Sequence, residues 1–142
     1  MGGNIMPSLF NLTSLQTLNL AFNMFNQLSA VLRSDLEKLA NLTHLNLSNS
    51  GLLEGQVPIS ISRLTKLVSL DLSQDFHPHT LKLEKPDLGI LIRNLSNLKQ
   101  LYLDGVNISS SGTKWCQTIS DSAPGLQTLS LRVNTVVNLE SQ

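Results

Sequence analysis

The short stretch DFHPH holds the residues with the most evident capacity for chemistry. It places His77 and His79 two residues apart beside Asp75, so an extended segment could bring two ligands to one ion. Metal sites built by proteins need three or four such ligands, and no third and fourth ligand is evident in the sequence. We therefore expect a polar loop tip here, with no metal and no other cofactor.

Motifs for covalent or phosphate chemistry do not occur in the chain. It has no G-x-S-x-G, no phosphate-binding loop and no H-E-x-x-H, and scattered Ser, His and Asp residues do not make a triad without geometry. Its one cysteine, Cys116, cannot close a disulfide within the chain, so the thiol is either free or paired with another chain. The sequence predicts that the protein is not an enzyme.

Glycan acceptors are a further candidate site. N-x-[ST] sequons occur at Asn11, Asn41, Asn46, Asn94 and Asn107. Such asparagines are modified only in a secreted protein, so glycosylation is expected in that context alone.

Composition narrows the class of protein. The 142 residues, 41% of them hydrophobic, allow one sizeable core. Ten Lys and Arg balance ten Asp and Glu, so no net charge attracts nucleic acid or an anionic membrane surface. No run approaches the roughly 18 to 20 apolar residues of a bilayer span, and the start MGGNIMPSLF does not resemble a secretory signal. We expect one domain that does not insert into a membrane by itself.

One sequence pattern, here called the repeat frame, recurs along the chain. The fold that it specifies must position the candidate residues named above. The pattern, L-x-x-L-x-x-L-x-L-x-x-N, is the leucine-rich-repeat signature. Ala123 is the one exception at the leucine positions of the five frames, which cover residues 12–23, 39–50, 64–75, 95–106 and 123–134. We predict an α/β solenoid of about five coils, a single array over residues 1–142. Short parallel strands should line its concave face, and irregular or short helical segments its convex side.

The coil geometry predicts how individual positions are oriented. Both leucines of each x-L-x-L-x strand point inward, and their neighbours face the concave surface. Polar side chains just after the strand are expected to turn inward and bond the next coil, although valine cannot. That position holds Asn23, Ser50, Asp75, Val106 and Asn134.

Convex segments carry local signals of their own. Gly55 and Pro58 belong to a G-x-[IV]-P turn, in which proline sets a bend and glycine supplies a permissive backbone. Apolar residues at 88, 91, 92 and 95 predict a short helix. Trp115 and Ile119 are four residues apart and predict a second helix that ends before Pro124.

A concave parallel sheet provides binding area without catalytic groups, so recognition of a protein or peptide ligand is the predicted use. Tyr102, between Asp71 and Arg132, is the expected anchor, because aromatic and Arg residues dominate interface energies. Convex or lateral contacts are equally compatible with the sequence. The candidate binding residues are Asn19, His44, Asn46, Asp71, Tyr102, Asp104 and Arg132.

Longer stretches resemble one family. LANLTHLNLSNSGLLEGQVPISISRLTKLVSLDLS, LKLEKPDL, NLSNLKQLYLDGVNIS and KWCQTIS follow one another as in the ectodomains of plant leucine-rich-repeat receptor-like proteins. They look most like the type implicated in resistance to Verticillium wilt. The resemblance implies a recognition segment for pathogen perception and defence signalling at the outer side of the plasma membrane. It also implies a pathogen-derived or endogenous ligand and a co-receptor kinase as partners.

The chain departs from that family pattern in two places. Asn134 stands where the family usually has a second cysteine, which leaves Cys116 without its implied partner, and LSAVLRSDLEKL replaces a proline-containing bend. Two other functions stay open. One is a soluble wall-associated inhibitor of a pathogen enzyme, because such proteins share the G-x-[IV]-P turn. The other is a truncated product without function, because caps, signal and membrane span are not found in the sequence.

Overall fold

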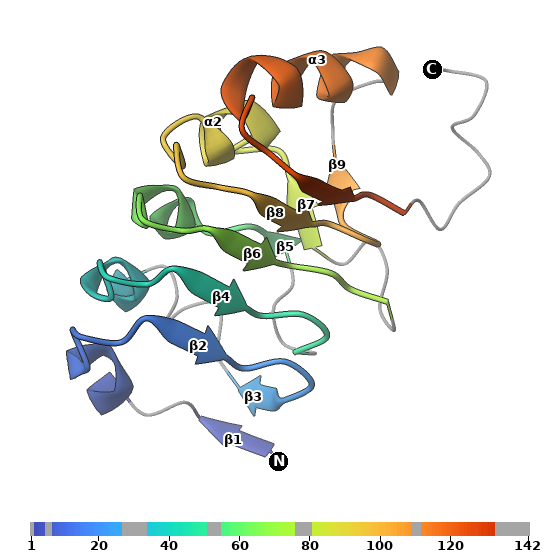
Figure 1. Cartoon of the computed structure of the whole chain (residues 1–142). Helices are drawn as coiled ribbons and strands as arrows, with labels where there is room; N and C mark the ends of the chain where they lie inside the picture. The colour runs from blue at the N-terminus through green and yellow to red at the C-terminus, as the bar shows by residue number, and fades with distance from the viewer. Residues whose placement is uncertain are drawn as a thin grey trace.

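A computed structural model describes residues 2–4, 7–26, 34–50, 55–75, 81–108 and 112–132. Its main sheet has five parallel strands stacked in chain order, one from each repeat (Figure 1). The third leucine of every frame sits at the centre of its strand and pairs with the equivalent leucine of the next coil. This arrangement confirms the predicted leucine-rich-repeat solenoid. The strands are β2 (Thr17–Asn19), β4 (His44–Asn46), β6 (Ser69–Asp71), β8 (Gln100–Tyr102) and β10 (Thr128–Ser130).

A second set of parallel strands lies behind the main sheet (Figure 1). β5 (Gly55–Gln56), β7 (Leu81–Leu83) and β9 (Asn107–Ile108) form a three-stranded sheet. β1 (Gly2–Asn4) pairs with β3 (Met24–Asn26) in a two-stranded sheet. The repeat frame does not predict these strands, because they do not fall at a constant distance from it.

Leucines from every coil form one continuous core. The framework residues Leu45, Leu70 and Leu101 are at most 1% exposed, so burial by neighbouring coils is nearly complete at the centre of the array. In the outermost described coils Leu12 is 52% exposed and Leu129 is 39% exposed. Apolar side chains are therefore exposed in both outermost coils of the described array.

The convex side is built from short helices. 3-10 helices occupy Pro7–Asn11, Leu36–Lys38 and Ile59–Arg63, and α2 (Leu88–Ile92) and α3 (Gly112–Ser122) follow at the later coils. The Asp87 carboxylate accepts a hydrogen bond from the Ile90 N–H at 2.9 Å and caps α2, as is usual at a helix N-terminus. Both predicted helices are confirmed. No helix in the described ranges is long and apolar enough to cross a membrane.

Glycines allow two tight features of this side. Gly55 has φ +79°, a conformation that side-chain-bearing residues rarely adopt, so the expected role of glycine in the G-x-[IV]-P turn is confirmed. Gly89 lies where α2 contacts α3, and a Cβ there would meet the Thr118 side chain at 3.1 Å. The close approach of the two helices therefore depends on the absence of a side chain at Gly89.

The polar positions after the strands differ in part from the prediction. Ser50 is buried as expected, but it donates to the Leu47 carbonyl of its own coil at 2.8 Å and not to the next coil, whereas Asp75 is exposed. In that coil Gln74 is the buried polar residue, 1% exposed, and its amide donates to the Leu72 carbonyl at 3.3 Å. The inward orientation expected of Asp75 is therefore wrong. Burial of a carboxylate is far more costly than burial of a neutral amide that can donate to a carbonyl.

The remaining residues at the position after the strand are Asn23, Val106 and Asn134. Asn23 donates to the Ala21 carbonyl of its own coil at 3.4 Å, which differs from the bond to a neighbouring coil that we expected. Val106 is buried, in accord with its apolar side chain, and Asn134 lies outside the described residues.

A left-handed backbone recurs at the same position of the turn after three of the main strands, β2, β4 and β8. Phe22 has φ +61°, Asn49 has φ +51° and Gly105 has φ +75°. The backbone N–H of each donates to a carbonyl of the next coil, at 3.1, 2.9 and 3.0 Å respectively. Gly and Asn tolerate this conformation, but a bulky residue is unfavourable in it. Phe22 is also 65% exposed, so burial of its ring offsets little of the cost of this backbone conformation.

Phe22→Asn is therefore expected to raise the free energy of unfolding by about 0.5 to 1 kcal/mol in a urea titration. Phe22→Ala is the matched control, since it removes the ring but keeps a residue that disfavours a positive φ, and it should not stabilise the chain. A lower unfolding free energy for Phe22→Asn than for the wild type would contradict this account.

Candidate ligand-binding surface

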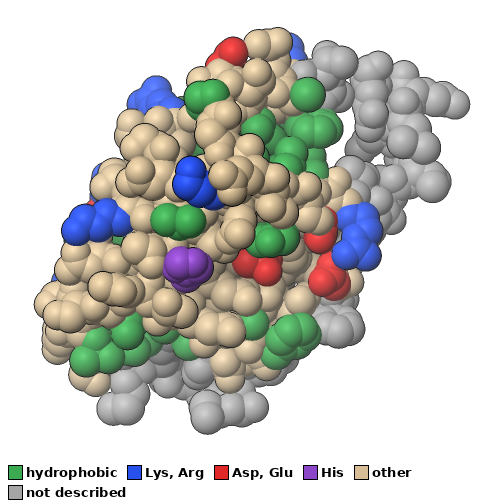
Figure 2. Space-filling view, viewed as in Figure 1, with side chains coloured by type: hydrophobic (Ala, Val, Ile, Leu, Met, Phe, Trp, Pro, Cys, Tyr) green, Lys and Arg blue, Asp and Glu red, His purple; other side chains and the backbone are tan. Residues whose placement is uncertain are grey.

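The outward side chains of the five main strands form a continuous polar surface, here called the sheet face (Figure 2). Alternation along each strand sends the residues on both sides of the central leucine to this surface. Most are uncharged and short, so the sheet face is suited to hydrogen bonding and shape recognition. Its members are Thr17, Asn19, His44, Asn46, Ser69, Asp71, Gln100, Tyr102, Thr128 and Ser130.

Three predicted binding residues also close the turns that follow their strands. The side-chain Oδ1 atoms of Asn19 and Asn46 each accept a hydrogen bond from the backbone N–H two residues later, at 2.9 Å in both cases. Asp71 Oδ1 accepts from the Ser73 N–H at 3.0 Å in the same way. These bonds orient the side chains, so any ligand contact would use the Nδ2 groups of the asparagines or Oδ2 of Asp71.

Asp104 joins the two last coils of the described array. Its carboxylate accepts from the Ser130 hydroxyl at 2.7 and 2.9 Å, from the Arg132 backbone N–H at 2.7 Å and from Arg132 Nη2 at 3.4 Å. Burial acts to raise the pKa of Asp104, but these hydrogen bonds and the Arg132 charge outweigh it and hold the pKa below its ordinary value. Asp104 is only 7% exposed, so its main role is to connect coils.

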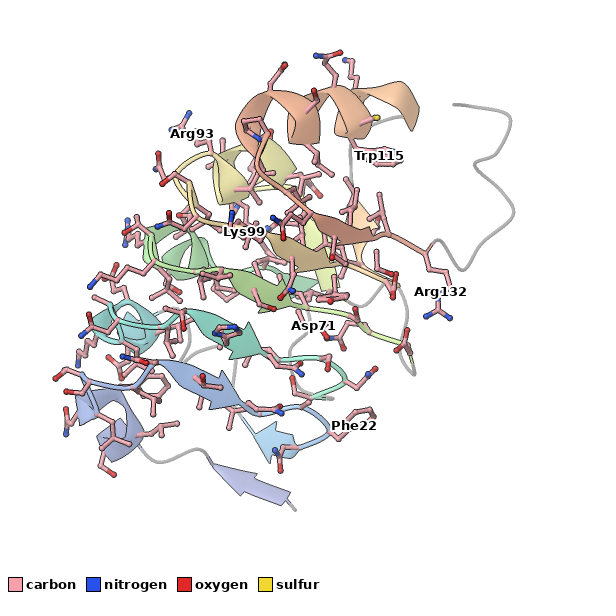
Figure 3. The ribbon with its side chains drawn as sticks, viewed as in Figure 1. Phe22, Asp71, Arg93, Lys99, Trp115 and Arg132 are labelled. Carbon is pink, nitrogen blue, oxygen red and sulfur yellow. The ribbon has the colours of Figure 1, made fainter. Side chains whose placement is uncertain are left out.

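Arg132 lies at the strand-end edge of the array (Figure 3), two residues after Ser130, which is the register partner of Tyr102. Its guanidinium is 3.4 Å from the Asp104 carboxylate and 3.9 Å from that of Asp75. The structure does bring Tyr102 next to Asp71, because the two residues are register partners in neighbouring strands. The expected anchor therefore has one of its two predicted charged neighbours adjacent in the sheet.

Toward the other end of the array the sheet face is less charged. His44 is exposed on β4, and its Nδ1 lies 2.9 Å from the Thr43 hydroxyl. Lys99, an exposed residue directly before β8, was not among the predicted binding residues. Strand alternation gives no signal for it, because a residue two positions before the inward Leu101 is expected to face the same way as Leu101.

No group of three His, Cys, Asp or Glu residues that could hold a metal ion exists in the described part of the chain. His77 and His79, the residues that prompted the metal hypothesis, lie outside that part. Cys116 is exposed on α3. These placements add no catalytic group to the sheet face.

The sequon asparagines have different surroundings. Asn11, Asn94 and Asn107 are exposed, and Asn46 is half-buried in β4. Asn41 is exposed, but its Nδ2 donates to the Thr13 carbonyl at 2.8 Å and its Oδ1 accepts from Lys66 at 2.7 Å. A glycan on Asn41 would alter these two contacts, whereas the exposed asparagines without them remain the simpler acceptor sites.

Comparisons with known proteins give relatives in one plant. The chain is 42% identical over 107 residues to receptor-like protein 6 of Arabidopsis thaliana, an alignment covering 73% of this chain and 10% of that protein. It is 47% identical over 108 residues to receptor-like protein 7 of the same plant, covering 72% of this chain and 11% of the relative. The chain thus spans about a tenth of the length of the curated relatives it matches. No family model matches the chain.

Solved structures share the fold at lower identity. An internalin (inlF) from Listeria monocytogenes has a TM-score of 0.65 and 23% identity, over 97% of this chain and 35% of the internalin. Internalin C2 of the same bacterium has a TM-score of 0.64 and 22% identity, over 90% of this chain and 46% of that chain. The plant peptide hormone receptor RGFR1, in complex with RGF2, has a TM-score of 0.61 and 23% identity, over 92% of this chain and 19% of the receptor.

Proposed function

The chain is a leucine-rich-repeat protein of the plant receptor-like group, and from that premise we propose that its sheet face recognises a protein or peptide ligand. The observation that carries the proposal is the half-exposed Tyr102 in register with Asp71, surrounded by short polar side chains. Aromatic residues in such settings supply much of the binding energy at protein interfaces. The fold is shared with a plant receptor solved in complex with RGF2, which is consistent with this use of the surface.

Finer aspects of the proposal come from the family resemblance described for the sequence. We propose that the ligand is pathogen-derived or endogenous, that recognition serves defence signalling, and that it takes place at the outer side of the plasma membrane together with a co-receptor kinase. Binding without turnover is part of the same proposal. Of the residues first proposed for binding, Tyr102, Asp71, His44, Asn19 and Asn46 form the candidate ligand surface. Asp104 and Arg132 border it.

The proposal is tested by selecting binders from a library of displayed random peptides on the purified chain and synthesising the selected peptides individually. Tyr102→Ala is expected to weaken their binding about tenfold or more in fluorescence anisotropy, as loss of a central aromatic contact does. Ile90→Ala is the control, since Ile90 is 41% exposed on α2, away from the sheet face, and should leave affinity unchanged. If every selected peptide bound Tyr102→Ala as well as the wild type, the sheet face would not be the ligand surface.

A further inference from the structure

Charged side chains on and around the sheet face are separated by sign. Lys99 stands at the start of β8, whereas Asp71 stands at the end of β6. Asp75 and Asp104 follow on the same strand-end side. Figure 2 shows Lys and Arg side chains over the strand-start side of the sheet and acidic side chains gathered on the strand-end side, with one basic side chain beyond them. A ligand on the sheet face would therefore meet a positive and a negative end.

Hydrogen bonds fix the backbone at Lys99 and the side chain of Asp71. The Lys99 N–H donates to the Val68 carbonyl at 2.8 Å, and the Lys99 carbonyl accepts from Gln127 and Thr128 at 2.8 and 2.9 Å. Asp71 is oriented by its bond from the Ser73 N–H. Within the described residues neither the Lys99 ammonium nor the Asp71 carboxylate takes part in an ion pair. The backbone of Lys99 and the carboxylate of Asp71 are thus fixed, and both charges remain available to a ligand.

The separation of the two charged residues follows from the strand register. Asp71 pairs with Tyr102, and Lys99 precedes Tyr102 by three residues. Three strand residues span about 10 Å and adjacent strands lie about 4.8 Å apart, so the two Cα atoms are about 11 Å apart. Ser69, Gln100 and Tyr102 occupy the surface between them and carry no charge at neutral pH. Figure 3 shows Lys99 and Asp71 on the same face of the sheet.

We infer that the ligand is a peptide segment with one acidic and one basic residue three or four positions apart. The acidic residue would contact Lys99 and the basic residue would contact Asp71. In a polyproline II segment, residues three apart lie on the same side and are separated by about 9 Å, close to the required distance. This inference rests on the proposed function and adds to it the chemistry of the ligand. The pre-positioned Asp71 carboxylate favours specificity because little ordering of this group is needed on binding.

The test uses a random dodecapeptide library displayed on phage and selected on the purified chain. Only peptides whose binding is lost in Tyr102→Ala are analysed, so that the sheet face is the surface examined. In these, acidic and basic residues three or four positions apart should be enriched roughly fivefold over the unselected library for each charge contact. Lys99→Glu should select peptides with two basic residues, and Asp71→Lys should select peptides with two acidic residues.

Arg93→Glu is the matched control, because Arg93 is an exposed cation at the end of α2 and lies away from the sheet face (Figure 3). It should select the same peptides as the wild type. Tyr102-dependent peptides without the charge pair, or an unchanged selection by both Lys99→Glu and Asp71→Lys, would overturn the inference and leave the proposed function standing. Failure to obtain any Tyr102-dependent peptide would overturn both.

Discussion

Leu101→Ala is expected to lower the free energy of unfolding by about 2 to 5 kcal/mol. Leu101 is fully buried at the centre of β8, between the equivalent leucines Leu70 and Leu129 of the adjacent coils. Truncation there removes apolar contacts and leaves a cavity that the parallel strands cannot readily collapse to fill. Because each coil is covered by its neighbours, the loss weakens two coil interfaces at once. Urea unfolding followed by circular dichroism measures the change.

The matched comparison for this prediction is Leu12→Ala. Leu12 belongs to the same repeat frame but is 52% exposed, so its truncation should change the unfolding free energy by about 0.5 kcal/mol or less. Leu45→Ala, at a residue 1% exposed, should resemble Leu101→Ala. Similar small effects for all three variants would contradict the assignment of Leu45 and Leu101 to the core.

Asp104→Ala is expected to lower the free energy of unfolding at neutral pH by about 1 to 3 kcal/mol. The loss should be larger if water does not replace the carboxylate as hydrogen-bond acceptor. The Asp104 carboxylate is the acceptor for the Ser130 hydroxyl and the Arg132 backbone N–H, so its removal leaves two donors of the next coil without this acceptor. Asp75→Ala is the control. Asp75 is exposed and 3.9 Å from the same arginine, where a surface ion pair contributes little.

The Asp104 contribution should also depend on pH. The pKa of Asp104 in the folded chain lies below its ordinary value of 3.8, so the folded state binds the proton less readily than the unfolded state. Its stabilisation is therefore fully present above the unfolded pKa and is lost as pH falls through the folded pKa. The difference in unfolding free energy between wild type and Asp104→Ala should shrink as the pH is lowered through this range. A difference that stayed constant from neutral pH to well below 3.8 would exclude the charge-assisted contacts as its cause.

Much of the fold was determined by the sequence alone, because the relevant signals are local. The repeat frame located all five strands of the main sheet, since a leucine pair in an x-L-x-L-x segment can be buried only if its neighbours face outward. Apolar spacing located α2 and α3, where the side chains that must be buried lie on one helical face. The strand positions also identified Tyr102 and Asp71 as outward residues.

The roles of the polar residues were decided by tertiary structure. Asp104 and Asp75 are both aspartates near a strand end, yet Asp104 is buried by contacts with the next coil and Asp75 is exposed. Gln74 took the buried position that the repeat frame assigns to Asp75. The partners concerned come from neighbouring coils, 26 to 28 residues away in the chain for Asp104.

The strand positions and register of the second sheet, β5-β7-β9, were also decided by tertiary structure. β5 begins further after the central leucine of its coil than β9 does, so no fixed spacing marks these strands in the sequence. Parallel strands pair only with residues from other coils, and the register depends on how the intervening segment folds. The sequence of each coil thus determines that its repeated leucines are buried. The hydrogen-bond partners of a polar group, by contrast, come into place only when the coils stack.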